Sequence, residues 1–256
     1  MITSTANQQM KRVIQLNKKA KTRYEQRVFV VEGMKLCMEA PKEEIAAMYV
    51  SESFLEEEDK RKKIQGYSYE VVSDHVFQTI SDTKTPQGIL SLVKMPEYHL
   101  EDLMGKNPHL LILESIQDPG NLGTMIRTGE GAGITGIIMN QTTVDVYHPK
   151  TIRAAMGALY RVPFYIAKDL QETIEYLKEK GIFLYGAHLE GNLSYDQPDY
   201  TRATGFLIGN EGNGLSAQTA ELADTWIQIP MEGQVESLNA AVAAALLMYE
   251  VRRQRK

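Results

Sequence analysis

The sequence predicts an α/β protein in which a small α/β domain precedes a larger domain built on a parallel sheet. From His109 onward, continuous apolar runs of four to six residues alternate with windows of helical periodicity. Such alternation is typical of a parallel sheet whose two faces are both covered by helices. The stretch "KMPEYHLEDLMGKNPH" holds two prolines and a glycine and lacks hydrophobic periodicity, which indicates a linker. The predicted boundaries are 1–95 for the first domain, 96–108 for the linker and 109–256 for the second domain.

The first domain begins with an expected helix over residues 3–19. Ser4 is a suitable N-cap residue, and Met10, Val13 and Leu16 give the helix a short apolar face. Apolar, β-branched runs predict strands at 27–33, 46–50, 69–73 and 88–95. Two further helices are expected, a charged and exposed one at 53–66 and a short one at 73–83.

The second domain is expected to contain six strands joined by helices. The strands are predicted at 110–115, 136–139, 164–167, 182–188, 204–210 and 226–230. Helical windows lie between them at 120–132, 149–160, 169–181 and 215–224. A polar loop at 232–239 leads into a helix that is apolar on nearly every face as far as Glu250. Ligands of open parallel sheets bind beyond the carboxyl ends of the strands, so a site is expected in the loops that follow them.

The composition is ordinary for a globular protein, with 43% hydrophobic and 24% charged residues. No apolar run approaches the roughly 18 residues of a membrane span, and the N-terminus lacks the apolar core of a signal peptide. The single cysteine, Cys37, allows no disulfide within the chain and is expected to be buried. The five histidines have no metal-ligand spacing. We therefore expect a cytoplasmic protein with no membrane segment and no structural metal.

The net charge of −5 is distributed unevenly along the chain. Residues 1–40 carry a net charge of +5, which leaves −10 for the remainder. A basic head on an acidic body suggests a module that binds a polyanion, although a solvated helix face has the same composition. The basic residues of this head are Lys11, Arg12, Lys18, Lys19, Lys21, Arg23, Arg27 and Lys35.

Three polar loops, each directly after a predicted strand, are candidates for the site. They lie within "ESIQDPGNLGTMIRTGEGAGITG" (114–136), "IGNEGNGLS" (208–216) and "IQIPMEGQVESLNAAVAAALLMYE" (227–250). In the first, Asn121 begins a helix and Arg127 follows, which is a good anion site. In the second, closely spaced glycines let the backbone approach a flat ligand around Glu211. In the third, Ser237 is expected to cap the last helix. Each signal alone also fits a salt bridge, a turn or a cap; their combination indicates a site.

These motifs resemble those of a known family. "NLGTMIRTGEGAG", "IGNEGNGL" and "IPMEGQVESLNAAVAAA", in this order, are similar to the three signature motifs of the SpoU/TrmH family of RNA ribose 2′-O-methyltransferases, in the SPOUT superfamily. The resemblance extends over residues 108–252. The first block, with "FVVEGMKLCMEA" and "TPQGILSLV", is similar to the ribosomal-protein-like RNA-binding domain that precedes many members. The basic residues of the head thereby become candidate RNA-binding residues.

The resemblance implies a function and a fold. The function is methyl transfer from S-adenosylmethionine to a ribose 2′-hydroxyl of structured RNA, with 23S ribosomal RNA expected first and transfer RNA second. The fold includes a deep C-terminal trefoil knot, which periodicity could not predict because knots are rare. A homodimer with the site at the subunit interface is also implied. A helix that is apolar all round must be buried on every side, which the knot and a partner subunit would together achieve for the last helix.

The resemblance also assigns roles to residues. Its catalytic arginine corresponds to Arg127, and its supporting active-site positions to Asn121, Glu211, Ser237 and Asn239. The cofactor-binding residues that follow from the motifs and from the end of the strand at 182–188 are Gly186, Ala187, His188, Gly209, Asn210, Gly212, Ile229, Met231, Ser237 and Leu238. In the family mechanism the arginine serves as general base or orients the hydroxyl. Because a guanidinium is normally always charged, electrostatic stabilisation of the forming alkoxide is the alternative.

The sequence departs from the family pattern at positions outside the polar set. Gly129 and Gly131 stand where the family often has alanine, and Ala240 and Ala241 where it often has valine and serine. Because the polar positions are intact, activity is expected. Two other hypotheses stay open: a non-catalytic RNA-binding or ribosome-assembly protein on the same scaffold, and a methyltransferase that acts on a base atom.

Overall fold

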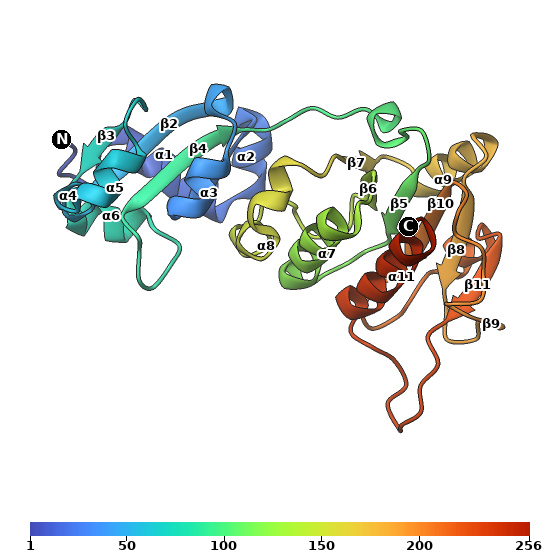
Figure 1. Ribbon diagram of the computed structural model, residues 1–256. Helices are drawn as coiled ribbons and strands as arrows, with labels where there is room; N and C mark the ends of the chain where they lie inside the picture. Colours follow the sequence, from blue (N-terminus) through green and yellow to red (C-terminus); the bar gives the residue numbers. More distant parts are fainter. The chain divides into compact units, whose positions relative to one another are not determined.

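The chain divides into two structural units in the computed structural model, which describes residues 1–256 (Figure 1). The first unit comprises Met1–Glu97 and Tyr147–Tyr160, and the second comprises Tyr98–Val146 and Arg161–Lys256. The predicted linker at 96–108 is therefore not a separate element. Most of it belongs to the second unit, where the short 3-10 helix η2 (Leu100–Leu103) packs Leu103 into the core.

The first unit is a four-stranded sheet with helices, in the strand order β1-β4-β2-β3. β4 is antiparallel to β1 and to β2, whereas β3 is parallel to β2. The strands are β1 (Val28–Glu32), β2 (Ile45–Ser51), β3 (Glu70–Val72) and β4 (Ile89–Lys94), close to the four that were predicted. The helices are α1 (Gln8–Lys18), α2 (Ala20–Gln26), α3 (Met34–Glu39), α4 (Glu52–Glu56), α5 (Glu58–Lys63) and α6 (Asp74–Ile80), with the 3-10 helix η1 (Lys42–Glu44). Cys37 is fully buried, as expected.

The first predicted helix is shorter than expected at its N-terminal end. Ser4 does not cap it; the N-cap is Asn7, whose side chain accepts a hydrogen bond from the backbone of Gln9. The helix also ends at Lys18, because Lys19 adopts an extended conformation before α2 begins. In the same way, the helix predicted at 53–66 divides into α4 and α5 at Glu57, which is likewise extended.

Arg23 of α2 stabilises the junction at Lys19, where α1 ends and α2 begins. Its side chain is only 2% exposed, and its guanidinium donates hydrogen bonds to the carbonyls of Leu16 and Asn17. The helix end leaves these carbonyls without partners inside the helix, so a buried guanidinium satisfies them. The prediction that Arg23 contacts RNA is therefore wrong, because the side chain is committed to the fold.

The segment Tyr147–Tyr160 lies in the first unit, although the sequence analysis placed it in the second domain. The Tyr147 ring packs on Phe29 of β1 with centroids 4.5 Å apart, and the Tyr160 hydroxyl donates to the Leu36 carbonyl at 3.0 Å. The segment contains α8 (Pro149–Ala155) and the 3-10 helix η3 (Met156–Tyr160). Aromatic packing between residues so distant in sequence leaves no local signal, which is why periodicity could not reveal it.

The second unit is built on a seven-stranded sheet whose ladders are all parallel, in the order β7-β6-β5-β10-β8-β11-β9. The strands are β5 (His109–Leu113), β6 (Gly136–Asn140), β7 (Phe164–Ala167), β8 (Phe183–Ala187), β9 (Leu193–Ser194), β10 (Thr204–Ile208) and β11 (Thr225–Gln228). The short edge strand β9 was not predicted. The helices are α7 (Pro119–Ala132), α9 (Leu170–Glu179), α10 (Ala217–Glu221) and α11 (Ala240–Gln254). The parallel-sheet prediction is confirmed.

The two central strands, β5 and β10, mark the point where the strand order changes direction. Their carboxyl ends lie side by side, since Leu113 pairs with Ile208. The loop after β5 leads into α7 and the loop after β10 into α10, so the first two motifs meet at one edge of the sheet. This is the position at which open parallel sheets bind ligands.

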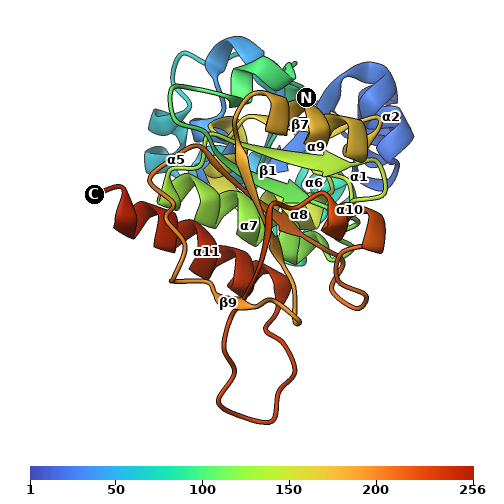
Figure 2. The same cartoon turned by 90° about the vertical axis from the view of Figure 1, so that its right-hand side faces the viewer.

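The last helix, α11, packs along α7 and against β5 and β10 (Figures 1 and 2). Its buried side contains Ala244, Leu247, Met248 and Val251. The opposite side carries an exposed stripe, defined by Val242, Leu246 and Tyr249, which lie one helical turn apart. The helix is therefore apolar all round, but one of its faces is uncovered in a single chain. No helix of the protein is long and apolar enough to cross a membrane.

His109 at the start of β5 predicts a pH dependence of stability. Its side chain is 2% exposed, and its Nε2 has no hydrogen-bond partner. Burial, with a smaller contribution from the nearby Arg255 charge, lowers the pKa of His109 from 6.5 to about 3. The unfolded chain therefore binds one more proton than the folded chain between these values, so stability falls as the pH drops below 6.5.

We expect the free energy of unfolding to decrease by roughly 1–2 kcal/mol between pH 6.5 and pH 5 through this residue. Urea unfolding at pH 7.5, 6.5 and 5.0 measures it. His109→Leu is expected to flatten this part of the profile whatever its effect on absolute stability. An unchanged slope in that variant would assign the acid sensitivity to other groups.

Candidate functional site

Glu211, at the tip of the loop after β10, joins the first two motifs. Its carboxylate accepts hydrogen bonds from the backbone amides of Gln117 (3.0 Å) and Asp118 (3.1 Å) and from Nδ2 of Asn121 (3.0 Å). Asp118 is the N-cap of α7 and accepts from the backbone of Asn121. Partial burial alone would raise the pKa of Glu211, but these hydrogen bonds together lower it, so the residue is a carboxylate at neutral pH.

Asn239 joins the third motif to the other two. Its Nδ2 donates to Oδ1 of Asn121 at 2.9 Å, while its Oδ1 accepts from the backbone amides of Ala241 and Val242. Asn239 is therefore the N-cap of α11, a role that the sequence analysis gave to Ser237. A continuous chain of hydrogen bonds runs from Glu211 through Asn121 to Asn239. Thus three of the five predicted active-site residues are brought together.

The other two predicted active-site residues lie outside this chain of hydrogen bonds. Ser237 is exposed in the polar loop before α11 and makes no hydrogen bond, so its predicted capping role is wrong. Arg127 lies on the exposed side of α7, and its guanidinium has neither an ion-pair nor a hydrogen-bond partner. An exposed guanidinium without a partner is available for an anion that the single chain does not contain.

The loop from Gly209 to Leu215 is held in a compact shape by Asn210. Its Nδ2 donates to the Ser115 carbonyl at 2.8 Å, and its Oδ1 accepts from the amides of Gly212 and Asn213. Gly209 is packed against the returning backbone, because a Cβ there would lie 2.0 Å from the Gly214 carbonyl carbon. The Asn210 side chain thus holds the loop in place with its oxygen and one N–H, so its contribution to a ligand site is mainly one of shape.

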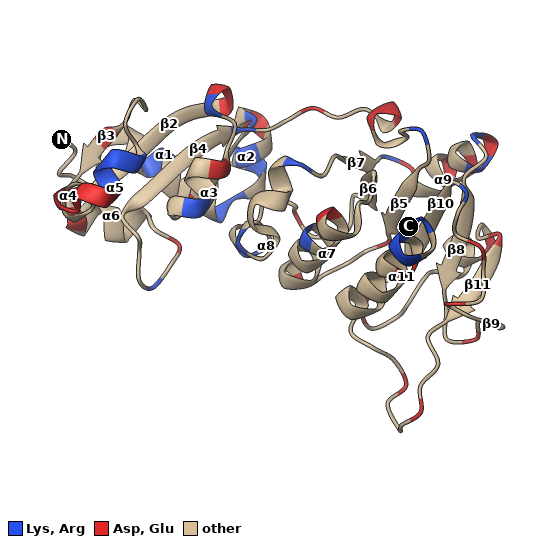
Figure 3. Cartoon of the chain, in the orientation of Figure 1, with Lys and Arg blue, Asp and Glu red and all other residues tan.

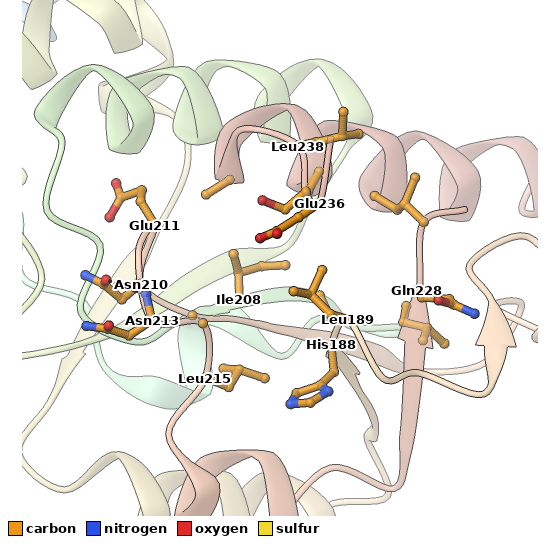
Figure 4. Close-up of a pocket in the computed structure, with 18 of the residues that line it drawn as sticks. His188, Leu189, Ile208, Asn210, Glu211, Asn213, Leu215, Gln228, Glu236 and Leu238 are labelled. Carbon is orange, nitrogen blue, oxygen red and sulfur yellow. Dashed lines mark hydrogen bonds between the residues drawn. The ribbon is translucent and has the colours of Figure 1, made fainter. Parts of the chain in front are cut away.

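A cavity of about 600 Å³ opens beside these loops (Figure 4). The loops after β8 and β10 form part of its wall, and the segment from β11 to α11 forms the rest. The predicted cofactor residues that line it are Ala187, His188, Gly209, Asn210, Gly212, Ile229, Met231, Ser237 and Leu238. Gly186 is not among the residues that line it; a Cβ at this position would meet the side chains of Ala223 and Trp226, and its contact with the cofactor stays a prediction.

The cavity also has walls that the sequence analysis did not identify. They include the strand ends Ile208 and Ile227, whose place at the carboxyl edge of the sheet could have indicated them, and Ala243 and Leu247 of α11. Three of the lining side chains are glutamates, and none is lysine or arginine; the glutamates are Glu190, Glu211 and Glu236. The cavity therefore favours a ligand with positive charge.

His188 at the end of β8 has a fixed orientation. Its ring stacks on the Trp226 indole with centroids 4.5 Å apart and an angle of 24° between the planes, and its Nδ1 accepts from the backbone of Glu190. Trp226 is fixed in turn, because its indole N–H donates to the Ala220 carbonyl. This arrangement makes His188 a rigid part of the cavity wall.

Seven of the eight basic residues of the head are exposed, and Arg23 alone is buried. Lys21 and Lys35 lie 3.8 Å from glutamates one turn along their helices, and Arg27 donates to the Pro96 carbonyl. Figure 3 shows blue segments, which mark Lys and Arg residues, on α2 and α5. The structure contains no group of three or more His, Cys, Asp or Glu side chains that could hold a metal ion.

Replacing Glu211 with Gln is expected to destabilise the site. An amide NH₂ would face one of the three N–H donors that the carboxylate now accepts, which costs about 1–3 kcal/mol. We expect a lower midpoint of thermal unfolding together with weaker ligand binding. Glu236→Gln is the matched control, because Glu236 lines the same cavity without a hydrogen bond. Equal unfolding midpoints for the two variants would contradict the assigned role of Glu211.

Comparison with known proteins identifies the family. The SpoU rRNA methylase family model matches residues 108–249, and the MRM3-like substrate-binding domain model matches residues 7–91. The chain is 34% identical over 98% of its length, and 98% of the other protein, to the 23S rRNA (guanosine(2553)-2′-O)-methyltransferase RlmP of Bacillus subtilis. It is 34% identical to the 23S rRNA (guanosine-2′-O-)-methyltransferase RlmB of Shewanella oneidensis, over 77% of this chain and 82% of that protein.

A solved structure agrees with these relatives. The AdoMet-bound rRNA methyltransferase of Sinorhizobium meliloti has a TM-score of 0.86 and 30% identity, covering 98% of this chain and 97% of that one. The match includes both structural units and the three motif loops. The resemblance noted in the sequence is thus confirmed, and the chain belongs to the SpoU rRNA methylase family.

Proposed function

We propose that this protein transfers a methyl group from S-adenosylmethionine to the 2′-hydroxyl of a guanosine in 23S ribosomal RNA. The observation that carries the proposal is the chain of hydrogen bonds from Glu211 through Asn121 to Asn239, which assembles the three motifs beside one cavity. The relatives from Bacillus subtilis and Shewanella oneidensis are both named as methylating guanosine in this RNA, which supports the choice of substrate.

The cavity fits the proposed methyl donor. S-adenosylmethionine carries a sulfonium and an ammonium against one carboxylate, so its net charge is positive, and the ionisable lining carboxylates complement it. The backbone at Gly209, which carries no side chain, allows close approach of a flat adenine. Ile229 and Leu238 provide apolar walls. When bound, this cofactor supplies an electrophilic methyl group whose transfer neutralises the sulfonium.

The chain's own residues would orient the acceptor and manage its proton. The ribose hydroxyl must lose its proton as it attacks, in line with the methyl carbon and sulfur. We assign Arg127 to stabilise the developing alkoxide and to hold an adjacent RNA phosphate, since a guanidinium stays charged. The proton then leaves through that phosphate or a water molecule. Glu211, Asn121 and Asn239 position the surrounding loops and do not exchange protons in this scheme.

A homodimer would complete the site. Arg127 does not line the cavity of its own chain, and the exposed stripe Val242, Leu246 and Tyr249 is uncovered. The two features are neighbours, because a Cβ added at Gly131, one turn after Arg127 on α7, would lie 3.0 Å from the Tyr249 hydroxyl. Burying this stripe against a second copy would thus carry the Arg127 face of α7 to the cavity of the partner.

We also propose that the C-terminal segment forms a trefoil knot. The tight approach of Gly209 to Gly214 and the insertion of β10 between β5 and β8 support a threaded path for the segment from β10 to α11. Membership of the family supports it further.

The first test is transfer of tritiated methyl groups from S-adenosylmethionine to total RNA of a deletion strain, followed by mapping of ribose positions that resist alkaline cleavage. One protected guanosine in 23S ribosomal RNA is expected. Label confined to transfer RNA would refute the substrate and leave the reaction intact. Absence of label from both free RNA and ribosomal precursors would favour a non-catalytic RNA-binding protein, and label on a base atom would refute ribose methylation.

The shared site is tested by mixing two inactive chains. Arg127→Ala removes the cation, and Ile229→Arg fills the cavity and adds a repelling charge. If the arginine acts on the partner's cavity, one of the two sites in each mixed dimer is complete, and co-expression is expected to restore about one quarter of wild-type activity. An arginine that acts within its own chain would give no recovery. Size-exclusion chromatography with light scattering of Leu246→Glu checks the dimer itself, which should dissociate.

A further inference from the structure

A second cavity, of about 420 Å³, lies in the first unit, and none of the basic head residues lines it. The end of α5 and the turn that leads into the edge strand β3 form it. Arg61, Lys62, Tyr67 and Tyr69 line it, and Ile64 contributes a buried floor. None of these residues belongs to the three motifs or to the candidate RNA contacts of the head.

The two tyrosines offer uncovered aromatic surface. Tyr69 is 36% exposed and Tyr67 is half-buried, and neither hydroxyl takes part in a hydrogen bond. The Gly66 turn between α5 and Tyr67 has a φ of +83°, a backbone conformation that glycine adopts readily and that turns the chain back toward α5. Flat aromatic rings at the mouth of a cavity are the platforms on which unstacked nucleobases bind.

Cations surround these rings. The Lys42 ammonium lies 4.9 Å from the centre of the Tyr67 ring, and Arg61 and Lys62 extend from the last turn of α5. Lys62 also pairs with Glu58 at 2.8 Å, so two cations and one carboxylate line the cavity, and Lys42 stands beside the Tyr67 ring as a third cation. A helix end favours cations for its own stability, but this does not explain why two tyrosines stand beside them. Cations next to stacking surfaces match a nucleotide, whose base is flat and whose flanking phosphates are anionic.

We infer that this cavity binds one unstacked nucleotide of the RNA substrate, with the base stacked on Tyr67 and Tyr69 and the flanking phosphates held by Arg61, Lys62 and Lys42. This inference deepens the proposed function, because it assumes that the substrate is RNA. It assigns to the first unit the recognition of a single-stranded feature, such as a loop or bulge, in addition to general attraction by its basic head.

The test uses the full-length protein and a single-stranded RNA of about ten nucleotides with a central 2-aminopurine, whose fluorescence falls when the base stacks on an aromatic ring. The wild type is expected to quench the probe. The double variant Tyr67→Leu/Tyr69→Leu should lose the quenching and bind about tenfold more weakly, whereas Tyr67→Phe/Tyr69→Phe should retain both. The Phe variant keeps the rings, so it separates stacking from any effect on folding.

The contribution of positive charge to RNA binding is tested by substituting two neighbouring lysines of α5 separately. Lys62 lines the cavity and Lys63 does not, although both are exposed. Lys62→Gln is expected to reduce the slope of the logarithm of the binding constant against the logarithm of salt concentration by about one. Lys63→Gln is expected to leave this slope nearly unchanged. Quenching and affinity that are the same in the wild type and the Leu double variant would overturn the inference.

Methyl transfer to ribosomal RNA is measured with the same preparations. If the wild type methylates RNA and the Leu double variant binds the probe normally, the inference about the nucleotide cavity is wrong and the proposed function stands. If the wild type methylates no RNA but quenches the probe in a way that depends on the two tyrosines, the proposed function is wrong and the inference about the nucleotide cavity is supported.

Discussion

Gly209→Ala is expected to abolish binding of S-adenosylmethionine and to destabilise the second unit. The added Cβ would lie 2.0 Å from the carbonyl carbon of Gly214 and 2.1 Å from the backbone nitrogen of Leu215. Both atoms belong to backbone rather than to a flexible side chain, so the loop itself would have to open. We expect a loss of about 4 kcal/mol or more in the free energy of unfolding, the range that marks severe steric disruption.

The same substitution at a nearby glycine provides the control. A Cβ at Gly212 would meet only the Asn210 side-chain oxygen, at 3.5 Å, which is ordinary contact. Isothermal titration calorimetry should show that the dissociation constant for S-adenosylmethionine rises more than about a hundredfold in Gly209→Ala and by less than about threefold in Gly212→Ala. Equal affinities for the two variants would show that the close approach at Gly209 does not shape the cavity.

Arg127→Ala is expected to remove most of the catalytic rate and to leave cofactor binding intact. Arg127 does not line the cavity of its own chain, whereas a cation that stabilises charge in the transition state contributes about 100- to 1,000-fold to kcat. Arg127→Lys keeps the charge but loses the planar pair of donors, so an intermediate rate is expected. Because the side chain is exposed and makes no hydrogen bond or ion pair, neither variant should lower the unfolding midpoint by more than a degree or two.

Single-turnover kinetics on 23S ribosomal RNA, with calorimetric titration of the cofactor, measure both effects. Thr124→Ala is the matched control, since Thr124 is exposed one turn earlier on the same helix. Its rate should equal that of the wild type. An Arg127→Ala rate within twofold of the wild type would remove Arg127 from the chemistry, and an unchanged rate with weaker cofactor binding would move it to the cofactor site.

Two of the departures of the sequence from the family pattern, Gly129 and Gly131, have a local explanation. A Cβ at Gly129 would lie 2.3 Å from the end of the Ile134 side chain and 3.5 Å from the Met248 sulfur. At Gly131 the neighbour would be the Tyr249 hydroxyl, at 3.0 Å. The two glycines of α7 thus leave room for the Ile134 side chain, which follows α7, and for the Met248 and Tyr249 side chains of α11. The smaller residues on one helix complement larger ones on the other, as close packing requires.

Much of the architecture was predictable because it depends on local patterns. Short continuous apolar runs that alternate with helical windows are typical of strands buried on both faces, and the six main strands of the second unit were found within one or two residues. The loops after β5 and β10 were recognised because each combines glycines with Asn, Arg or Glu, a combination that is typical of a turn or a ligand site. The same reasoning failed where two local signals competed. Ser237 and Asn239 are both good caps, and only the partner Asn121 selects Asn239.

What the sequence by itself determined was the order of the elements, the motif loops and the family to which they belong. The tertiary structure alone decided that Arg23 is buried, that Tyr147–Tyr160 packs in the first unit, and that Arg127 is exposed and does not line the cavity of its own chain. The physical reason is distance along the chain. Glu211 meets Asn121 across 90 residues and Tyr147 meets Phe29 across more than a hundred, so no local preference encodes these contacts, and they arise only when the packed sheet brings the segments together.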